Sequence, residues 1–291
     1  MIESELPLPG LYSWEGQKGW PSTQSNHKRL SMQQKLFYMQ RQDDIQKTWS
    51  LLKPRKITSH NLVRIGKDQG PGKYGDGGYV MVDELLDQGN IAYSFGVGGT
   101  MDWEVDIRER GYQIHCYDPT VDGLPCPEEE QENLHFHKVG ISGQETDTHI
   151  TMATAIAANG HEKEKNMLLQ CDIEGHEWAA FASTPQKTLC QFSQILIEFH
   201  WLLRFSTDLQ TLAYIQRVLK NLSKNFTPYH IHANTAVGYF MVNGKKVPEV
   251  IEISYVRNDL CEFSNESPTF PTELDRPNSK KPEIQIGKWG W

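Results

Sequence analysis

Ionisable side chains gather directly after an apolar run in MLLQCDIEGHEW, residues 167–178. Helix capping explains them incompletely, because Asp172 lacks a capping-box glutamate and Glu174 is a poor residue for a helix N-cap. Carboxylates at a strand end can instead position a substrate, bind a cation or accept a proton. We therefore take Asp172 as a candidate site residue and Glu174 as a weaker one. His176 and Glu177 are expected to begin the next helix.

Two later β runs end in the same kind of side chain. Glu198 and His200 alternate near the end of QILIEFH, so they share one face of a strand. An acid beside a histidine can orient it as a general base or share a metal ion with it. His230 and His232 repeat this spacing in TPYHIHANT. Because buried carboxylates and imidazoles need partners, a functional polar cluster is favoured over a purely structural one.

An earlier strand ends in a glycine turn, SFGVGGT. Gly96 and Gly98 would let the backbone approach a ligand at a helix N-terminus. Asp118 follows about twenty residues later, where an acid can accept from ribose hydroxyls. An adenosine-containing ligand is therefore favoured over a plain turn and a solvated acid. A nicotinamide cofactor is disfavoured, because the GxGxxG fingerprint fails at Met101.

These residues require a fold that brings several strand ends together. From residue 91 to 222, β-rich runs alternate with helical patterns, which predicts a mainly parallel sheet with helices on both faces. Three further β runs follow, and Asn243-Gly244 is a hairpin signal that predicts an antiparallel edge. The predicted fold class is α/β, doubly wound, with ligands bound at the carboxyl ends of the strands. The predicted strands are 91–99, 112–120, 134–142, 166–172 and 194–200, and the predicted helices are 101–111, 176–183 and 208–222.

The two ends of the chain differ from this body. We expect an arm and an amphipathic helix over 1–52, a catalytic body over 53–260, and a proline-rich tail over 261–291 that packs on it. The arm proper occupies residues 1 to about 28. The glycine-rich loop DGGYV, residues 76–80, could be a lid or merely a turn.

Composition narrows the function classes. The chain has 291 residues and a net charge of -8, which argues against nucleic acid as its main partner. It has no apolar run near the roughly 20 residues that a membrane helix needs. Its five cysteines form no CxxC pair, so a metal finger or a disulfide framework is poorly supported. Three Asn-x-Ser/Thr sequons, at Asn221, Asn225 and Asn265, are a weak indication of secretion. The sequence identifies neither the compartment nor the oligomeric state.

The motifs taken in order resemble a known family. RIGKDQGPGKYGDGGYV, YSFGVGGTMDWEVDI, HCYDPT, LLQCDIEGHEW, ILIEFH, HIHAN and VIEISYV are similar to the methyltransferase-like family that includes methyltransferase-like protein 24. That family is related to the FkbM type of S-adenosylmethionine-dependent O-methyltransferases. The resemblance covers about residues 62–257 and implies a seven-stranded methyltransferase sheet.

The resemblance also implies a cofactor site and an acceptor class. FkbM-type enzymes commonly methylate hydroxyls of sugars and small natural products, which implies a glycan or glycoside hydroxyl as acceptor. There are two alternatives: a methyltransferase that acts on a non-sugar small molecule, and a module that binds S-adenosylmethionine without catalysis. The implied cofactor-binding residues are Gly96 and Gly98 at the amino-acid part, Asp118 at the ribose, Gly140 and Ile141 at the adenine, and Asp172 beside the methyl-transfer centre.

Two mechanisms follow for activating the acceptor hydroxyl. In the first, His200 is the general base, Glu198 orients it and Asp172 positions the acceptor. In the second, Asp172, Glu198 and His232 hold Mn²⁺ or Mg²⁺, which lowers the pKa of the hydroxyl.

Overall fold

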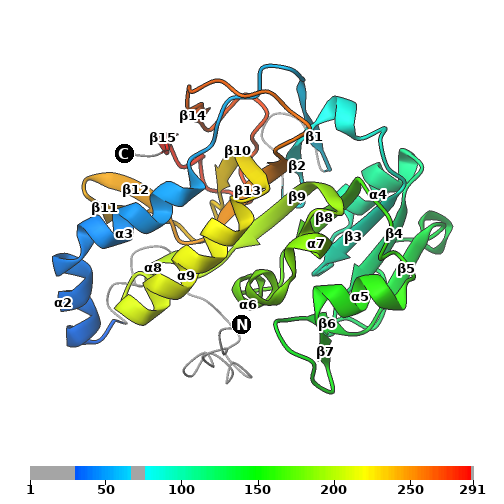
Figure 1. Cartoon of the computed structure of the whole chain (residues 1–291), viewed down its shortest axis with the longest axis horizontal. Coiled ribbons are helices and arrows are strands. Elements are labelled where there is room, and N and C mark those ends of the chain that lie inside the picture. The colour runs from blue at the N-terminus through cyan, green and yellow to red at the C-terminus, as the bar shows by residue number, and fades with distance from the viewer. Residues whose placement is uncertain (1–29, 67–75, 290–291) are drawn as a thin grey trace.

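A seven-stranded sheet forms the centre of the computed structural model, which describes residues 30–66 and 76–289 (Figure 1). The predicted arm at 1 to about 28 lies outside the described residues. In spatial order the strands are β10, β13, β9, β8, β3, β4 and β5. Their bounds are β3 Ile91–Phe95, β4 Gln113–Tyr117, β5 Leu134–His137, β8 Met167–Cys171, β9 Phe192–Phe199, β10 Phe226–Ala233 and β13 Ile251–Arg257.

Strand direction brings the functional ends together. β13 pairs antiparallel with both β9 and β10, whereas the other neighbouring pairs are parallel. The carboxyl ends of all strands except β13 therefore lie at one edge of the sheet. The α/β, doubly wound, mainly parallel prediction is confirmed. The sequence predicted an antiparallel strand at the edge of the sheet, whereas the antiparallel strand β13 lies one position in from the edge strand β10.

The late hairpin forms a separate ribbon. Asn243 and Gly244 both have positive φ, 45° and 78°, and join β11 (Tyr239–Val242) to β12 (Lys245–Pro248). Such a two-residue turn needs left-handed backbone, which Asn and Gly adopt at low cost. The hairpin is thus present, and the strand that follows it enters the main sheet as β13.

Helices cover both faces of the sheet and bury separate cores. On one face, Trp103 and Ile107 pack against Ala92 and Ile114. On the other face, strand residues such as Tyr93 pack in a larger core. The first face carries α4 (Asp102–Glu109) and the hairpin of β1 (Leu62–Ile65) and β2 (Tyr79–Val82). The second face carries α3 (Gln42–Trp49), α5 (Met152–Ala158), α6 (Glu177–Ser183) and α9 (Leu209–Leu222). The short helices α7 (Gln186–Leu189) and α8 (Leu202–Phe205) join neighbouring elements. The β1–β2 hairpin and α5 were not predicted.

Helix α9 illustrates why these segments fold as they do. Its buried residues Leu212, Ile215, Leu219 and Leu222 recur at helical spacing, and burial of each contributes about 1.5–3 kcal/mol. Asp208 caps its first turn by accepting from the Thr211 N–H at 2.8 Å.

The predicted amphipathic helix at 30–52 is divided into three pieces. It forms α2 (Met32–Gln40), α3 (Gln42–Trp49) and the 3₁₀ turn η1 (Ser50–Leu52). The break falls at Arg41, whose φ of -117° and ψ of 26° are not helical. Residues of α3 and η1, including Trp49 and Leu52, are buried in the core, whereas α2 has no buried residue.

The chain's last described segment packs back on this helix. The short strands β14 (Thr269–Phe270) and β15 (Gly287–Lys288) pair, and the Trp289 indole N–H donates to the carbonyl of Trp49 at 3.0 Å. Trp289 is buried, so this part of the tail lies against the body. In the described ranges no helix is both long and apolar enough to cross a membrane.

Candidate active site

His200 lies at the centre of a group of four carboxylates. Its ring is buried, and Nδ1 lies 3.0 Å from Glu177 Oε1. Nε2 faces Glu174 Oε2 at 3.6 Å, Asp172 Oδ1 at 3.7 Å and Glu198 Oε1 at 3.8 Å. These three distances exceed that of a hydrogen bond. The ligand atoms of Asp172, Glu174 and His200 lie within 4.8 Å of one another and frame a small gap, and Glu198 lies beside it.

The loop after β8 places the first of these acids. Asp172 continues the strand, and its N–H donates to the Phe95 carbonyl at 2.8 Å. Glu174 and Gly175 then take φ values of +55° and +106°, which turn the chain towards α6. Glu177 Oε1 accepts from the N–H groups of Ile173 and Gly175 at 2.9 and 3.1 Å. One carboxylate thus fixes both the loop and the histidine.

The acids on the neighbouring strands extend the site. Glu198 and His200 point to the same side of β9, with Phe199 in the core of the opposite face, as predicted. Glu198 Oε1 accepts from Asn234 Nδ2 at 2.8 Å. In the sheet register Glu252 lies beside Glu198. Asp76, in the DGGYV loop, is close enough for its charge to raise the pKa of Glu198.

Burial and mutual charge shift the pKa values of the whole group. Burial raises the pKa of Asp172 to about 7, and the charge of His200 opposes this rise only in part. Burial and Asp172 raise the pKa of Glu198 well above its ordinary value. Burial alone would lower the pKa of His200, but Glu177 and the other acids outweigh it and raise that pKa well above its ordinary value. The raised pKa values of Asp172 and Glu198 mean that these acids hold their protons to higher pH than exposed carboxylates do.

The glycine turn and Asp118 form a second part of the site. Asp118 Oδ2 accepts from the N–H groups of Val97 and Gly98 at 3.1 and 3.0 Å, and Oδ1 accepts from Thr120. Burial opposes ionisation of Asp118, but these hydrogen bonds lower its pKa. The carboxylate therefore holds the turn in place, in addition to the ribose contact that the resemblance implies.

Gly96 and Gly98 of this turn differ in what surrounds them. A Cβ on Gly96, at φ +86°, would lie 1.6 Å from the Asp172 carbonyl oxygen, so close packing of the turn on the β8 loop requires glycine. A Cβ on Gly98 would meet no described atom within 4 Å. The Gly98 side of the turn is open to a ligand.

The residues implied at the adenine lie after β5. Gly140 and Ile141 form the short strand β6 (Gly140–Ile141), which pairs with β7 (His149–Ile150). A Cβ on Gly140 would lie 2.4 Å from the His149 ring, and Ile141 is buried. Packing explains both residues here, and their cofactor contact stays a prediction.

His230 and His232 lie apart from the group around His200. His232 Nδ1 lies 2.9 Å from Glu252 Oε2, and its Nε2 lies 3.0 Å from Glu283 Oε2. Both ring nitrogens of His232 are thus engaged. Within the described ranges, the group whose atoms could jointly hold a metal ion is Asp172, Glu174 and His200, whose ligand atoms lie within 4.8 Å of one another. The predicted metal ligands Asp172, Glu198 and His232 share Asp172 with this group, and their role stays a prediction.

Several residues of the site were missed by sequence reasoning. Glu177 was expected only to begin a helix, and its contact with His200 needs the loop to turn back. Tyr79 accepts from Gln170 at 3.1 Å near the same acids. The DGGYV motif was the available signal for Tyr79 and Asp76, because its glycines permit a tight loop.

A cavity of about 560 Å³ opens beside the glycine turn. It is lined by Gly66, Gly99, Thr100 and the start of α4, together with Pro125, Cys126, Pro127 and Glu130. None of the carboxylates around His200 lines this cavity, so the cavity and the acid group are separate features of the surface. The chemistry of the strand ends is the better guide to the reacting centre.

The strand order, with one antiparallel strand between β9 and β10, and the glycine turn followed by an acid after the next strand define a class I methyltransferase fold. The family model described as "Methyltransferase domain" matches residues 24–237, and the chain belongs to this family. It is an S-adenosylmethionine-dependent methyltransferase. The narrower relation to the FkbM type stays a prediction.

Solved structures with a similar fold are distant in sequence. The apo-structure of CmcI-N160 is 11% identical with a TM-score of 0.36, over 59% of this chain and 67% of that chain. The fibrillarin pre-rRNA processing protein of Methanococcus jannaschii is 9% identical with a TM-score of 0.35, over 60% and 68%. A TehB-like SAM-dependent methyltransferase from Corynebacterium glutamicum is 11% identical with a TM-score of 0.33, over 60% and 86%. No match was found among curated proteins.

Proposed function

We propose that this methyltransferase methylates a hydroxyl of a sugar, in a glycan or glycoside, with a divalent cation held by Asp172, Glu174 and His200. The observation that carries the proposal is the gap around His200 Nε2, with three carboxylate oxygens at 3.6–3.8 Å. S-adenosylmethionine supplies the methyl group on a sulfonium that is ready for displacement.

The residues around the gap fit Mn²⁺ or Mg²⁺. Carboxylate oxygens suit both ions, and one imidazole is compatible with Mn²⁺. Asp172 Oδ1 is buried and makes no hydrogen bond with the described residues. Glu177 supports the same interpretation, because a metal-binding histidine commonly donates its other ring N–H to a carboxylate. A bound cation lowers the pKa of a hydroxyl that it contacts.

This arrangement favours the cation mechanism over His200 as general base. The Nδ1 of His200 is engaged by Glu177, and a bound cation would displace the proton of Nε2 and occupy that nitrogen, so His200 would have no nitrogen left to act as the base. Glu198 is the remaining carboxylate beside the group, and Asn234 holds it. Burial and the neighbouring acids raise the pKa of Glu198 in the metal-free site, and a bound divalent cation would lower it. We therefore assign the ionised Glu198 of the cation-loaded site as the acceptor of the hydroxyl proton. The acceptor oxygen forms a bond to the methyl carbon as the carbon–sulfur bond breaks, which yields an ether and S-adenosylhomocysteine.

The charge of the site supports an uncharged acceptor. The charged groups that act on Asp172 and Glu198 are other acids and His200. Carboxylates accept hydrogen bonds from hydroxyls and repel phosphate or carboxylate groups. A neutral sugar with several hydroxyls satisfies this surface better than a phosphorylated one.

Labelled methyl transfer tests the proposal directly. Wild-type protein is incubated with labelled S-adenosylmethionine and neutral glycosides, phosphorylated sugars or non-sugar alcohols, with Mn²⁺, Mg²⁺ or EDTA. We expect transfer to a neutral glycoside that EDTA abolishes and Mn²⁺ restores. Asp172→Asn should lower the rate at least about 100-fold, since it removes an oxygen with full charge from the group. Asp259→Asn, which alters an exposed acid at the opposite edge of the sheet, serves as the control.

Each part of the proposal can fail separately. Transfer that persists unchanged in EDTA contradicts the cation. Preference for phosphorylated sugars contradicts the acceptor class. Binding of S-adenosylmethionine with no transfer to any acceptor indicates a binding module instead.

A further inference from the structure

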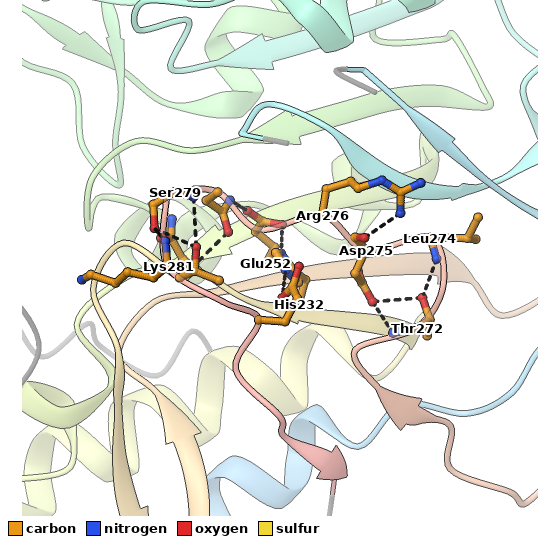
Figure 2. A network of polar contacts seen from close by, with 12 residues as sticks. His232, Glu252, Thr272, Leu274, Asp275, Arg276, Ser279 and Lys281 are labelled. Atoms are coloured by element: carbon orange, nitrogen blue, oxygen red, sulfur yellow. Dashed lines mark hydrogen bonds and ion pairs between the residues drawn. The ribbon is translucent and has the colours of Figure 1, made fainter. Parts of the chain in front are cut away.

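A segment of the tail crosses the edge of the sheet next to the candidate active site. We name residues 271–283 the C-terminal strap. Figure 2 shows its network of polar contacts with β10 and β13. His230 Nε2 lies 3.1 Å from Asp275 Oδ1, and His232 Nε2 lies 3.0 Å from Glu283 Oε2. Asp275 also accepts from the N–H and hydroxyl of Thr272. Two separate carboxylates thus fix the strap on two buried histidines.

A row of side chains connects the strap to the reacting centre. Glu198, Glu252 and His232 are direct neighbours in the register of β9, β13 and β10. Adjacent strands lie about 4.8 Å apart and opposite residues point to the same face. The row therefore runs without a gap from the acid that we assign as proton acceptor to the histidine that holds Glu283.

Asn278 of the strap connects three segments at this row. Its Nδ2 donates to Glu252 Oε1 at 2.5 Å and lies 3.3 Å from Asp76 Oδ1. Its Oδ1 accepts from the Thr235 N–H at 3.3 Å. An amide suits this place because it can donate to two carboxylates and accept from a backbone N–H at the same time.

A second route leads from Asn278 to Glu198. Thr235 is held by Asn278 and by Ser279, whose N–H donates to the threonine hydroxyl at 3.0 Å. The preceding residue, Asn234, donates to Glu198 Oε1 at 2.8 Å. Displacement of the strap would therefore disturb Glu198 both through Glu252 and through Asn234.

We propose that the C-terminal strap is a wall of the active site and that Asn278 is a positioning residue that sets the orientation of Glu198 and Glu252 towards the acceptor. The inference rests on the proposed function, because that function makes Glu198 the proton acceptor.

The test compares Asn278→Ala with Asn258→Ala in the full-length chain. Asn258 Oδ1 accepts from a threonine as well, from the Thr227 hydroxyl at 2.7 Å, but near the start of β10 and away from the rim. For Asn278→Ala we expect kcat on the neutral glycoside to fall about 10–100-fold and Mn²⁺ binding, measured by calorimetry, to weaken about 10-fold. The Kd for S-adenosylmethionine should be unchanged. Asn258→Ala should match wild type in all three.

Asn278→Asp provides a readout that a merely structural role would not move. The added carboxylate lies against Glu252 and Asp76 and should shift the acidic limb of the kcat–pH profile to higher pH. Ser279→Ala is a milder change of the same wall, in case Asn278→Ala does not fold. It should lower kcat and Mn²⁺ affinity in the same direction by a smaller factor.

The outcomes separate the two proposals. If wild type transfers methyl and binds Mn²⁺, but Asn278→Ala and Ser279→Ala both behave like Asn258→Ala, the role of the strap is overturned and the proposed function stands. If wild type neither transfers methyl nor binds Mn²⁺, the proposed function is lost and the positioning role falls with it.

Discussion

At the scale of single residues, Glu177 orients the ring of His200. Its side chain is fully buried, and its Oε1 receives the Nδ1 contact together with two backbone N–H groups. The ring is thereby held with Nε2 towards the gap. A neutral residue in this place would bind the ring and the loop more weakly.

We expect Glu177→Gln to weaken Mn²⁺ binding about 10–100-fold, as loss of an outer carboxylate does at other metal sites. Isothermal titration of Mn²⁺ into the variant measures this. Glu164→Gln, at an exposed position, should bind like wild type. Equal affinity in both variants would rule out Glu177 as the residue that orients His200.

The candidate residues could be predicted to different degrees. Asp172, Glu198 and His200 could be predicted because parallel strands deliver their end residues to one edge. His232 could not be placed correctly by the same rule. Its partners Glu252 and Glu283 come from β13 and the strap, and no local pattern indicates either contact.

At the scale of elements, the loop between β8 and α6 carries backbone strain. Glu174 is not glycine, yet its φ is +55° and its side chain is largely exposed. A non-glycine residue in this region costs about 1–2 kcal/mol. Such strain persists where the side chain has a function.

Glu174→Gly should therefore separate stability from cation binding. We expect the melting temperature to stay equal or rise, because glycine adopts positive φ without strain. Mn²⁺ affinity should fall at least about 10-fold, since an oxygen ligand is removed. Asn133→Gly, at φ 64° on an exposed turn, is the control for placing glycine at a positive φ, and it should leave Mn²⁺ affinity unchanged. A large drop in the melting temperature of Glu174→Gly would contradict the strain argument.

The main sheet was predictable because strands and helices alternate along residues 91–222. The hairpin of β1 and β2 and the helix α5 were missed, since these short runs pack against distant parts of the chain. The insertion of β13 between β9 and β10 also depends on long-range pairing, which no local turn signal specifies.

At the scale of the whole molecule, the buried acids and histidines give stability a definite pH dependence. The pKa values of His200 and His232 are raised by their carboxylate partners, so the stability they add is complete below about pH 6.5 and is lost as pH rises. Asp172, with its pKa raised to about 7 by burial, acts in the same direction between about pH 4 and 7. Asp275 acts in the opposite direction, because burial is outweighed by His230 and its pKa falls to about 2.

We therefore expect the metal-free protein to melt at a higher temperature at pH 6 than at pH 9. Asp275 does not reverse this, since its contribution is lost only as pH falls below about 4. Thermal melts in EDTA measure the difference, and Mn²⁺ should reduce it by replacing the proton of the acid group. Glu283→Gln should shrink the difference, because it removes a partner of His232. A higher melting temperature at pH 9 in EDTA would contradict these assignments.

The strap also ties activity to the order in which the chain is made. The glycine turn, Asp118 and the loop after β8 emerge from the ribosome well before Asn278 and Glu283. A nascent chain can thus complete its cofactor side while the acceptor side still lacks a wall. With the strap as the wall that we propose, full methyl transfer would begin only after residues 271–283 have emerged.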